Sequence, residues 1–150
     1  MGNKIFLLQT EKGKGLFAGE EILAGEKILE FEKNFVDYST NKTLRIGENT
    51  HQLSTDPEAF ENFINHSCEP TAQIDFKNLF LIASRTIDKG EEITYDYFTS
   101  DWEDEDVFDC RCGSSNCRLL VNGFKNLTQE ERLKIKDKLS PFLLSKLELN

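Results

Sequence analysis

Four cysteines have the clearest chemical potential in this chain of 150 residues. Three of them lie in CRCGSSNC, residues 110–117, and Cys68 stands alone in NFINHSCEP, residues 62–70. Three thiolates on a short loop can surround a metal ion, but they leave a tetrahedral zinc ion one ligand short. Cys68 would complete a four-thiolate zinc site if the fold brings it to the other three. Two disulfides, or four unrelated cysteines, are the alternatives.

Two tyrosines form a second candidate site. Tyr95 and Tyr97 lie in GEEITYDYF, residues 90–98, which has the pattern of a strand. Residues two apart share one face of a strand, so both rings can line one channel. Ordinary core tyrosines of a strand are the alternative.

Two other motifs are weak evidence for a functional site. Residues 13–18 fit the dinucleotide pattern G-x-G-x-x-A, but that motif needs a helix directly after it, and Gly19 and Gly25 interrupt any such helix. His66 and Ser67 do not indicate a hydrolase, because no G-x-S-x-G elbow is present and adjacent side chains on an extended backbone point apart. A histidine packed in a structural turn is the simpler interpretation.

The elements that must position these residues are mostly short strands. Alternating apolar residues and turn signals predict strands at 4–9, 16–18, 26–32, 71–76, 79–87 and 93–98, with a hairpin around Lys77-Asn78. Residues 33–55 are polar and poorly patterned. A short helix is expected over residues 57–64, with Asp56 as its N-cap and Pro57 in its first position.

Capping signals predict helices in the C-terminal part of the chain. Thr128 and Glu131 form a capping box, and Ser140-Pro141 opens a second helix. Many short strands with helices gathered at the C-terminus predict an irregular, β-rich α+β fold.

Composition limits the partners. The chain has 18 basic and 27 acidic residues, a net charge of −9, and no Lys/Arg cluster. This argues against direct nucleic-acid binding and favours a basic partner. Residues 101–109 carry six of the acids, which form either a solvated loop or a surface that attracts a basic substrate. No apolar run approaches a membrane span, and no signal peptide or myristoylation pattern is present, so we expect an intracellular protein, cytoplasmic or nuclear, with no membrane partner.

Four ordered motifs resemble those of the SET-domain protein lysine methyltransferases. KGKGLFAGEEILAGEKI (12–28) looks like the N-terminal glycine segment, and NHSCEP (65–70) resembles the asparagine-histidine-serine-cysteine signature. GEEITYDYF (90–98) looks like the C-terminal signature, and DCRCGSSNCRLL (109–120) looks like a post-SET zinc motif. The resemblance covers about residues 4–120 and is specific because the four motifs occur together and in order.

The resemblance implies a fold and a division of the chain. It implies a SET-domain fold of several short-stranded sheets with a knot-like C-terminal threading, a post-SET zinc loop and C-terminal helices. The expected parts are a SET domain at 1–100, an acidic loop with the zinc motif at 101–120 and a helical extension at 121–150.

The resemblance also implies an activity, an S-adenosylmethionine-dependent protein-lysine N-methyltransferase that adds mainly one methyl group, and to a lesser extent two. The implied substrate is a basic protein or peptide, histone-like or ribosomal. The implied catalytic residues are Tyr97 and Tyr95, of which Tyr95 sets the number of methyl groups. The implied cofactor-binding residues are Lys12, Gly13, Lys14, Gly15, Asn65, His66, Tyr97 and Leu119. The implied ligands of one structural zinc ion are Cys68, Cys110, Cys112 and Cys117.

The sequence also departs from the family pattern. Thr71 replaces the asparagine that commonly follows the signature proline, residues 32–60 are a short insert, and no cysteine-rich region precedes the domain. These departures bear on the substrate. A SET-like module that turns over poorly and binds a basic protein as a scaffold is the second hypothesis, and Tyr97 with the intact cofactor motifs counts against it.

Overall fold

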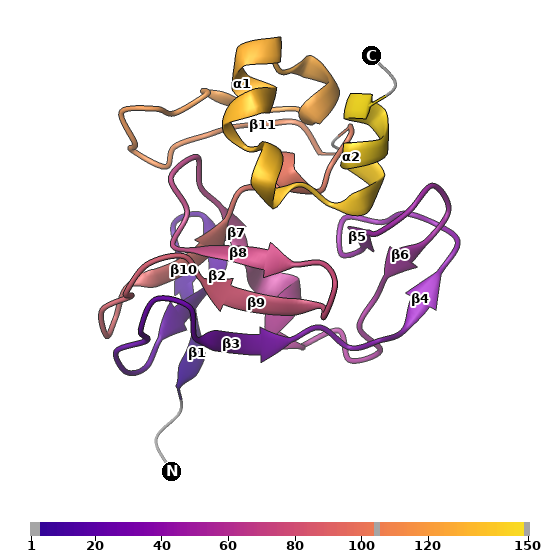
Figure 1. Ribbon diagram of the computed structural model, residues 1–150. Helices are drawn as coiled ribbons and strands as arrows, with labels where there is room; N and C mark the ends of the chain where they lie inside the picture. Colours follow the sequence, from indigo (N-terminus) through magenta and orange to yellow (C-terminus); the bar gives the residue numbers. More distant parts are fainter. Residues whose placement is uncertain (1–3, 104–105, 149–150) are drawn as a thin grey trace.

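The first sheet unites the motifs singled out by the sequence. The computed structural model describes residues 4–103 and 106–148. This sheet has the order β1-β2-β10-β7 (Figure 1). Its strands are β1 (Ile5–Thr10), β2 (Gly13–Ala18), β10 (Glu92–Tyr95) and β7 (Asn65–His66). β10 runs antiparallel to β2 and parallel to β7, with Tyr95 opposite His66. The register therefore places the asparagine-histidine pair beside the tyrosine strand.

The second sheet contains the predicted hairpin. Its order is β3-β9-β8, with the strands β3 (Lys27–Glu30), β9 (Phe80–Ala83) and β8 (Ala72–Asp75). Asp75 pairs with Phe80, and its carboxylate accepts hydrogen bonds from the backbone N–H groups of Lys77 and Asn78. The aspartate side chain thus shapes the turn between the two strands.

The poorly patterned residues 33–55 hold a third small sheet. Its order is β4-β6-β5, and its two-residue strands are β4 (Phe35–Val36), β6 (His51–Gln52) and β5 (Leu44–Arg45). A ribbon of β11 (Phe108–Asp109) and β12 (Leu120–Val121) brackets the cysteine-rich segment. Strands this short leave almost no alternation in the sequence to recognise.

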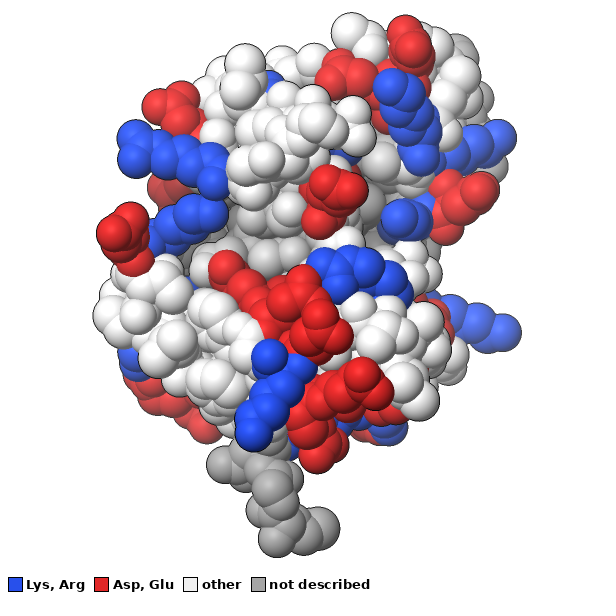
Figure 2. All heavy atoms as spheres, turned by 90° about the vertical axis from the view of Figure 1, so that its left-hand side faces the viewer, with Lys and Arg blue, Asp and Glu red and all other residues white. Residues whose placement is uncertain are grey.

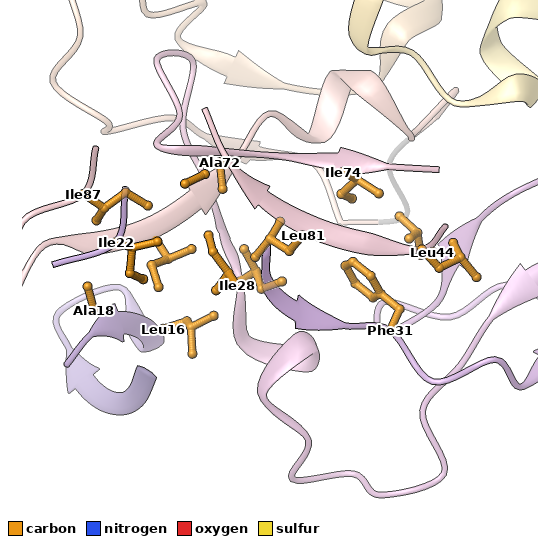
Figure 3. Close-up of a cluster of buried hydrophobic side chains, with 14 residues drawn as sticks. Leu16, Ala18, Ile22, Ile28, Phe31, Leu44, Ala72, Ile74, Leu81 and Ile87 are labelled. Atoms are coloured by element: carbon orange, nitrogen blue, oxygen red, sulfur yellow. The ribbon is translucent and has the colours of Figure 1, made fainter. Parts of the chain in front are cut away.

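The main core lies between the first two sheets. Leu16, Ile22, Leu81, Ile87 and Ile93 are fully buried members of this core. Figure 3 shows Leu16 of β2, Leu81 of β9 and the bridged residues Ile22 and Ile87 in one cluster. Burying each such side chain contributes about 1.5–3 kcal/mol. This core forms the base on which the site residues of β2, β7 and β10 are held.

The C-terminal helices share a second core with the cysteine-rich segment. They are α1 (Gln129–Lys134), the 3₁₀ helix η4 (Lys136–Lys138) and α2 (Pro141–Glu148), with a further 3₁₀ turn η3 (Phe124–Asn126) before them. The capping box of Thr128 and Glu131 is present, and Ser140 Oγ accepts from the backbone N–H of Leu143. The second core includes Phe98, Cys110, Val121, Phe124 and Leu143.

The third sheet and α2 also touch. The Arg45 guanidinium lies 3.8 Å from the centre of the Phe142 ring, which fits the position of α2 above β5 in Figure 1. Of the helices in the described part of the chain, none is long and apolar enough to cross a membrane.

Two predicted elements were wrong in detail. The helix expected over residues 57–64 is only the 3₁₀ turn η1 (Phe60–Phe63), with Ala59 at its N-cap and no side-chain cap. Asp56 Oδ1 accepts from the backbone N–H of Glu58, as an N-cap would, but Ala59 with φ −59° and ψ 143° is not helical, so no helix continues from Pro57. The strand expected over residues 93–98 ends at Tyr95, and the 3₁₀ helix η2 (Tyr97–Thr99) follows it.

Candidate active site and metal centre

A cleft of about 710 Å³ brings distant motifs to one place. Lys12, Asn65, His66 and Tyr97 line one part of it. Loop residues around β5 and residues 101–103, 106 and 108–112 line most of the rest. The predicted cofactor residues Gly13, Lys14, Gly15 and Leu119 are not among the described residues that line this cleft, and their contacts with a cofactor stay predictions.

The glycine segment leaves space for the side chain of Asn65. Gly13 has a φ of +96°, which favours glycine. A Cβ atom at Gly15 would lie 2.7 Å from Glu92 Oε2 and 3.1 Å from Asn65 Nδ2. The Asn65 amide needs this space, because it donates to the Lys14 carbonyl oxygen at 3.2 Å and to Glu92 Oε2 at 2.9 Å. Asn65 therefore ties together three strands of the first sheet.

Tyr97 is held at both its backbone and its hydroxyl. Its hydroxyl donates to the carbonyl oxygen of Ile64 at 2.6 Å, and its backbone N–H donates to His66 Nδ1 at 3.0 Å. The Tyr95 and Tyr97 rings lie 4.9 Å apart, and Phe108 meets Tyr97 edge-on at 6.2 Å. The rings meet although the two tyrosines do not share a strand, because η2 turns Tyr97 back toward Tyr95.

A smaller pocket of about 80 Å³ adjoins the same tyrosines. Phe31, Ile64 and Tyr95 line this pocket. Tyr97 and Asp101 line both the pocket and the large cleft. Tyr97 thus stands where the narrow pocket and the wide cleft meet.

His66 joins the tyrosine to the cysteines. Burial lowers the pKa of His66 to about 4, helped by the nearby Arg118 and opposed by Asp96, so the ring is neutral at pH 7. Because Nδ1 accepts from Tyr97, the proton belongs on Nε2, which lies 3.3 Å from Cys68 Sγ. The neutral ring donates to the sulfur of Cys68 and accepts from the backbone of Tyr97.

The four cysteine sulfurs form one cluster. All four Sγ atoms lie within 4.8 Å of one another, and Cys68 Sγ and Cys110 Sγ are 3.8 Å apart. The ligand atoms of a tetrahedral zinc site with Zn–S bonds of about 2.3 Å are separated by about 3.8 Å. The backbone N–H groups of Arg118 and Leu119 donate to the sulfurs of Cys68 and Cys117. These residues therefore fit a zinc ion, and all four cysteines are free of disulfides.

Lys12 connects the segment before β2 to the cysteine-rich loop. Its Nζ donates to the carbonyl oxygen of Arg111 at 3.0 Å, so the segment before β2 contacts the cysteine-rich loop. Leu119 follows that loop with its side chain 70% exposed and a φ of +71°. A positive φ is uncommon for leucine and holds this apolar side chain outward.

The acidic segment borders the cleft. Asp101, Glu103 and Asp106 line it, while Asp104 and Glu105 lie outside the described residues. A hydrogen bond from Lys125 lowers the pKa of Glu103. Figure 2 shows acidic and basic side chains on both sides of a hollow across one face, so the acidic excess does not form an unbroken acidic face there.

Some functional contacts were beyond sequence reasoning. Ile64 acts through its backbone carbonyl, and Glu92 acts through a hydrogen bond to Asn65 that only the strand register brings about. Phe108 lies between Val107 and Asp109 at the end of the acidic segment, and its aromatic ring was the one available signal. Arg118 gave no signal beyond its position next to Cys117.

The comparisons with known proteins point to one family. The SET domain profile matches residues 13–98. An H3 lysine-4 specific histone-lysine N-methyltransferase of Aspergillus oryzae is 34% identical over 130 residues, 72% of this chain and 11% of that protein. The Arabidopsis thaliana histone-lysine N-methyltransferase ASHH3 is 37% identical over 138 residues, 77% of this chain and 37% of that protein. The chain thus spans well under half of these relatives.

Solved structures show the same fold. KRYPTONITE in complex with mCHH DNA, an H3(1-15) peptide and SAH aligns with a TM-score of 0.63 and 24% identity, over 77% of this chain and 29% of that one. The methyltransferase domain of human SETMAR aligns with a TM-score of 0.58 and 21% identity, over 79% of this chain and 58% of that one.

Proposed function

This chain belongs to the SET domain family, and from that premise we propose that it transfers a methyl group from S-adenosylmethionine to the side-chain amine of a protein lysine. The observation that carries the proposal is the position of Tyr97. Its ring borders both the wide cleft and the narrow pocket, and its hydroxyl is fixed on Ile64.

The narrow pocket suits the nucleophile. A free lysine has a pKa of about 10.4, so its amine must lose a proton before it can attack. The Tyr95, Tyr97 and Phe31 rings would desolvate the ammonium group and lower that pKa. Once the ammonium has released a proton to water, the neutral amine would form the new N–C bond while the bond between the methyl group and the donor sulfur breaks, and the sulfur would keep that electron pair.

Tyr97 is proposed to position the reacting groups. S-adenosylmethionine, when bound, supplies an electrophilic methyl group on a good leaving group. Because the Tyr97 hydroxyl proton is committed to Ile64, the oxygen offers only lone pairs toward the cavities. Lone pairs attract the positively polarised methyl group and the amine hydrogens. The main contribution of the chain is therefore alignment.

The remaining cofactor contacts are proposals of the same kind. We assign the donor to the cleft wall made by Lys12, Asn65 and His66. Further contacts from the glycine segment 13–15 and from Leu119 are proposed on the family resemblance alone. We assign one structural zinc ion to Cys68, Cys110, Cys112 and Cys117. The division into a SET domain at 1–100, an acidic and zinc segment at 101–120 and a helical extension at 121–150 also stays a proposal.

The proposed substrate is a basic, histone-like protein. The relatives are named for H3 lysine 4 and, in Debaryomyces hansenii, H3 lysine 36, and KRYPTONITE was solved with an H3 peptide. Tyr95 supports mainly monomethylation, because a hydroxyl beside the amine occupies space that a further methyl group would need. The same hydroxyl lies 3.4 Å from Ser100 Oγ, which helps to fix it.

A filter assay with radiolabelled S-adenosylmethionine tests the proposal. Purified histones and ribosomal proteins serve as parallel substrates, and mass spectrometry identifies the modified residue. We expect label on lysine and more label on histone H3 than on ribosomal proteins. Stable binding of histone H3 without any transfer would instead favour the scaffold hypothesis.

A further inference from the structure

Arg118 and Asp96 form a buried, two-pronged ion pair. Arg118 Nη1 and Nη2 donate to the two carboxylate oxygens of Asp96 at 2.9 and 2.8 Å. The side chains are only 14% and 5% exposed. The guanidinium also lies 4.6 Å from the centre of the Phe98 ring. This parallel geometry is the strongest form of such a pair and requires an arginine.

Asp96 is the N-cap of the helix that begins with Tyr97. Its Oδ1 accepts from the backbone N–H of Phe98 at 3.0 Å, and its carbonyl oxygen accepts from the Thr99 hydroxyl at 2.7 Å. The position of Tyr97 therefore depends on where Asp96 is held. Asp96 in turn is held by Arg118.

Arg118 belongs to the cysteine cluster as much as to the tyrosine segment. It follows Cys117 directly, and its backbone N–H donates to Cys68 Sγ at 3.3 Å. Its side chain can reach Asp96 only while the cysteine-rich loop is docked. Without Arg118, the Asp96 carboxylate would be left buried with its charge uncompensated, so it would take up a proton or turn toward water. Either change weakens the cap.

We propose that Arg118 is a positioning residue for Tyr97, and that it transmits the docking of the metal loop to the catalytic tyrosine through the Asp96 cap. The kinetic part of this inference rests on the proposed methyltransferase function, whereas its structural part does not. A second link runs from Cys68 through His66 to the Tyr97 backbone, and it touches the Arg118 path at Cys68 and at Asp96, whose Oδ1 lies 3.7 Å from His66 Nδ1.

The kinetic test compares Arg118→Ala and Arg118→Lys with the unmodified protein. We expect Arg118→Ala to lower kcat on the order of tenfold to a hundredfold, as displaced reacting groups do, with zinc content and the KM for S-adenosylmethionine unchanged. Arg118→Lys should recover part of kcat, because an ammonium group restores the charge without the two parallel bonds. Arg85→Ala is the matched control, since it removes a surface pair with Glu91.

A double variant separates positioning from simple folding. Asparagine is a good N-cap and needs no counter-charge, so adding Asp96→Asn to Arg118→Ala should cause no further loss of kcat. Unchanged kcat in Arg118→Ala would overturn the proposal. Loss of kcat together with zinc would also overturn it, because Arg118 would then merely hold the loop.

Amide hydrogen exchange tests the structural part without any activity. In Arg118→Ala, the amides of residues 97–101 should exchange faster, while those of β2 should keep their protection. Equal exchange at residues 97–101 would overturn the inference. If the unmodified protein transfers no methyl group, the proposed function fails, and this exchange result alone decides the role of Arg118.

Discussion

The Tyr97 hydroxyl donates a hydrogen bond of 2.6 Å to the backbone carbonyl oxygen of Ile64. Ile64 directly precedes the Asn65–His66 strand, so the same short segment positions the tyrosine oxygen and supplies two residues of the cleft wall. The orientation of the Tyr97 hydroxyl therefore depends on the backbone of this segment.

Replacing Tyr97 with phenylalanine should lower kcat by about a hundredfold or more, because the reacting groups lose the oxygen that aligns them. The lost hydrogen bond should cost only about 1 kcal/mol of stability. Methyl transfer is measured under saturating donor, and unfolding is followed by circular dichroism. A folded variant that retains the full rate would remove Tyr97 from the mechanism.

Tyr95→Phe should have the opposite effect on products. Removing the Tyr95 hydroxyl frees room beside the amine and releases it to turn for another transfer. We expect the products to shift from monomethyl-lysine toward dimethyl- and trimethyl-lysine, with kcat largely kept. Mass spectrometry of the product peptide measures the distribution. Abundant trimethyl-lysine from the unmodified protein would show that a different ring limits the pocket.

Cys68→Ser should release zinc as readily as Cys112→Ser, because both sulfurs belong to one cluster. Elemental analysis measures one zinc ion per chain in the unmodified protein. Ser115→Ala, an exposed substitution in the same loop, is the control and should keep the metal. Full zinc retention in Cys68→Ser would refute a four-thiolate site.

Loss of zinc should loosen the tail more than the main core. The four cysteines lie in or against the second core, and none contributes to the core between the first two sheets. Limited proteolysis of the chelated protein should therefore cut first within residues 109–120. Global unfolding on chelation would contradict this division.

Neutralising the acidic segment should weaken the long-range attraction between this protein and a basic substrate. The variant with amides at Glu103, Asp104, Glu105 and Asp106 should raise the KM for a basic substrate at low salt with little change in kcat, because long-range attraction acts before binding. A control of equal charge neutralises exposed acids that do not line the cleft, namely Glu20, Glu21, Glu130 and Asp137. Equal KM values in both variants would make the segment an ordinary solvated loop.

The sequence predicted those parts of the fold that local chemistry encodes. Asp75 and the C-terminal caps work within a few residues of their partners, so their motifs were readable. Asp56 was misread, because aspartate before proline suits a turn as well as a helix start. The sheet in residues 33–55 escaped notice because two-residue strands carry no periodicity.

The sequence predicted which residues form the candidate site better than it predicted the contacts between them. Cys68 was assigned to its distant partners by ligand count and family resemblance, and the structure brings these residues together. The hydrogen bond to Ile64 and the pair of Arg118 with Asp96 depend on chain crossings far apart in sequence, which spacing alone does not contain. Tyr95 and Tyr97 meet for a different reason from the one predicted, since η2 separates them from a common strand.

Tandem mass spectrometry of histone H3 after incubation with S-adenosylmethionine and this protein tests the central claim most directly. We predict monomethyl-lysine on H3 with the unmodified protein, and none above background with Tyr97→Phe at the same zinc content. If the zinc-loaded, folded protein leaves every lysine of H3 and of the parallel basic proteins unmodified, the methyltransferase account is contradicted.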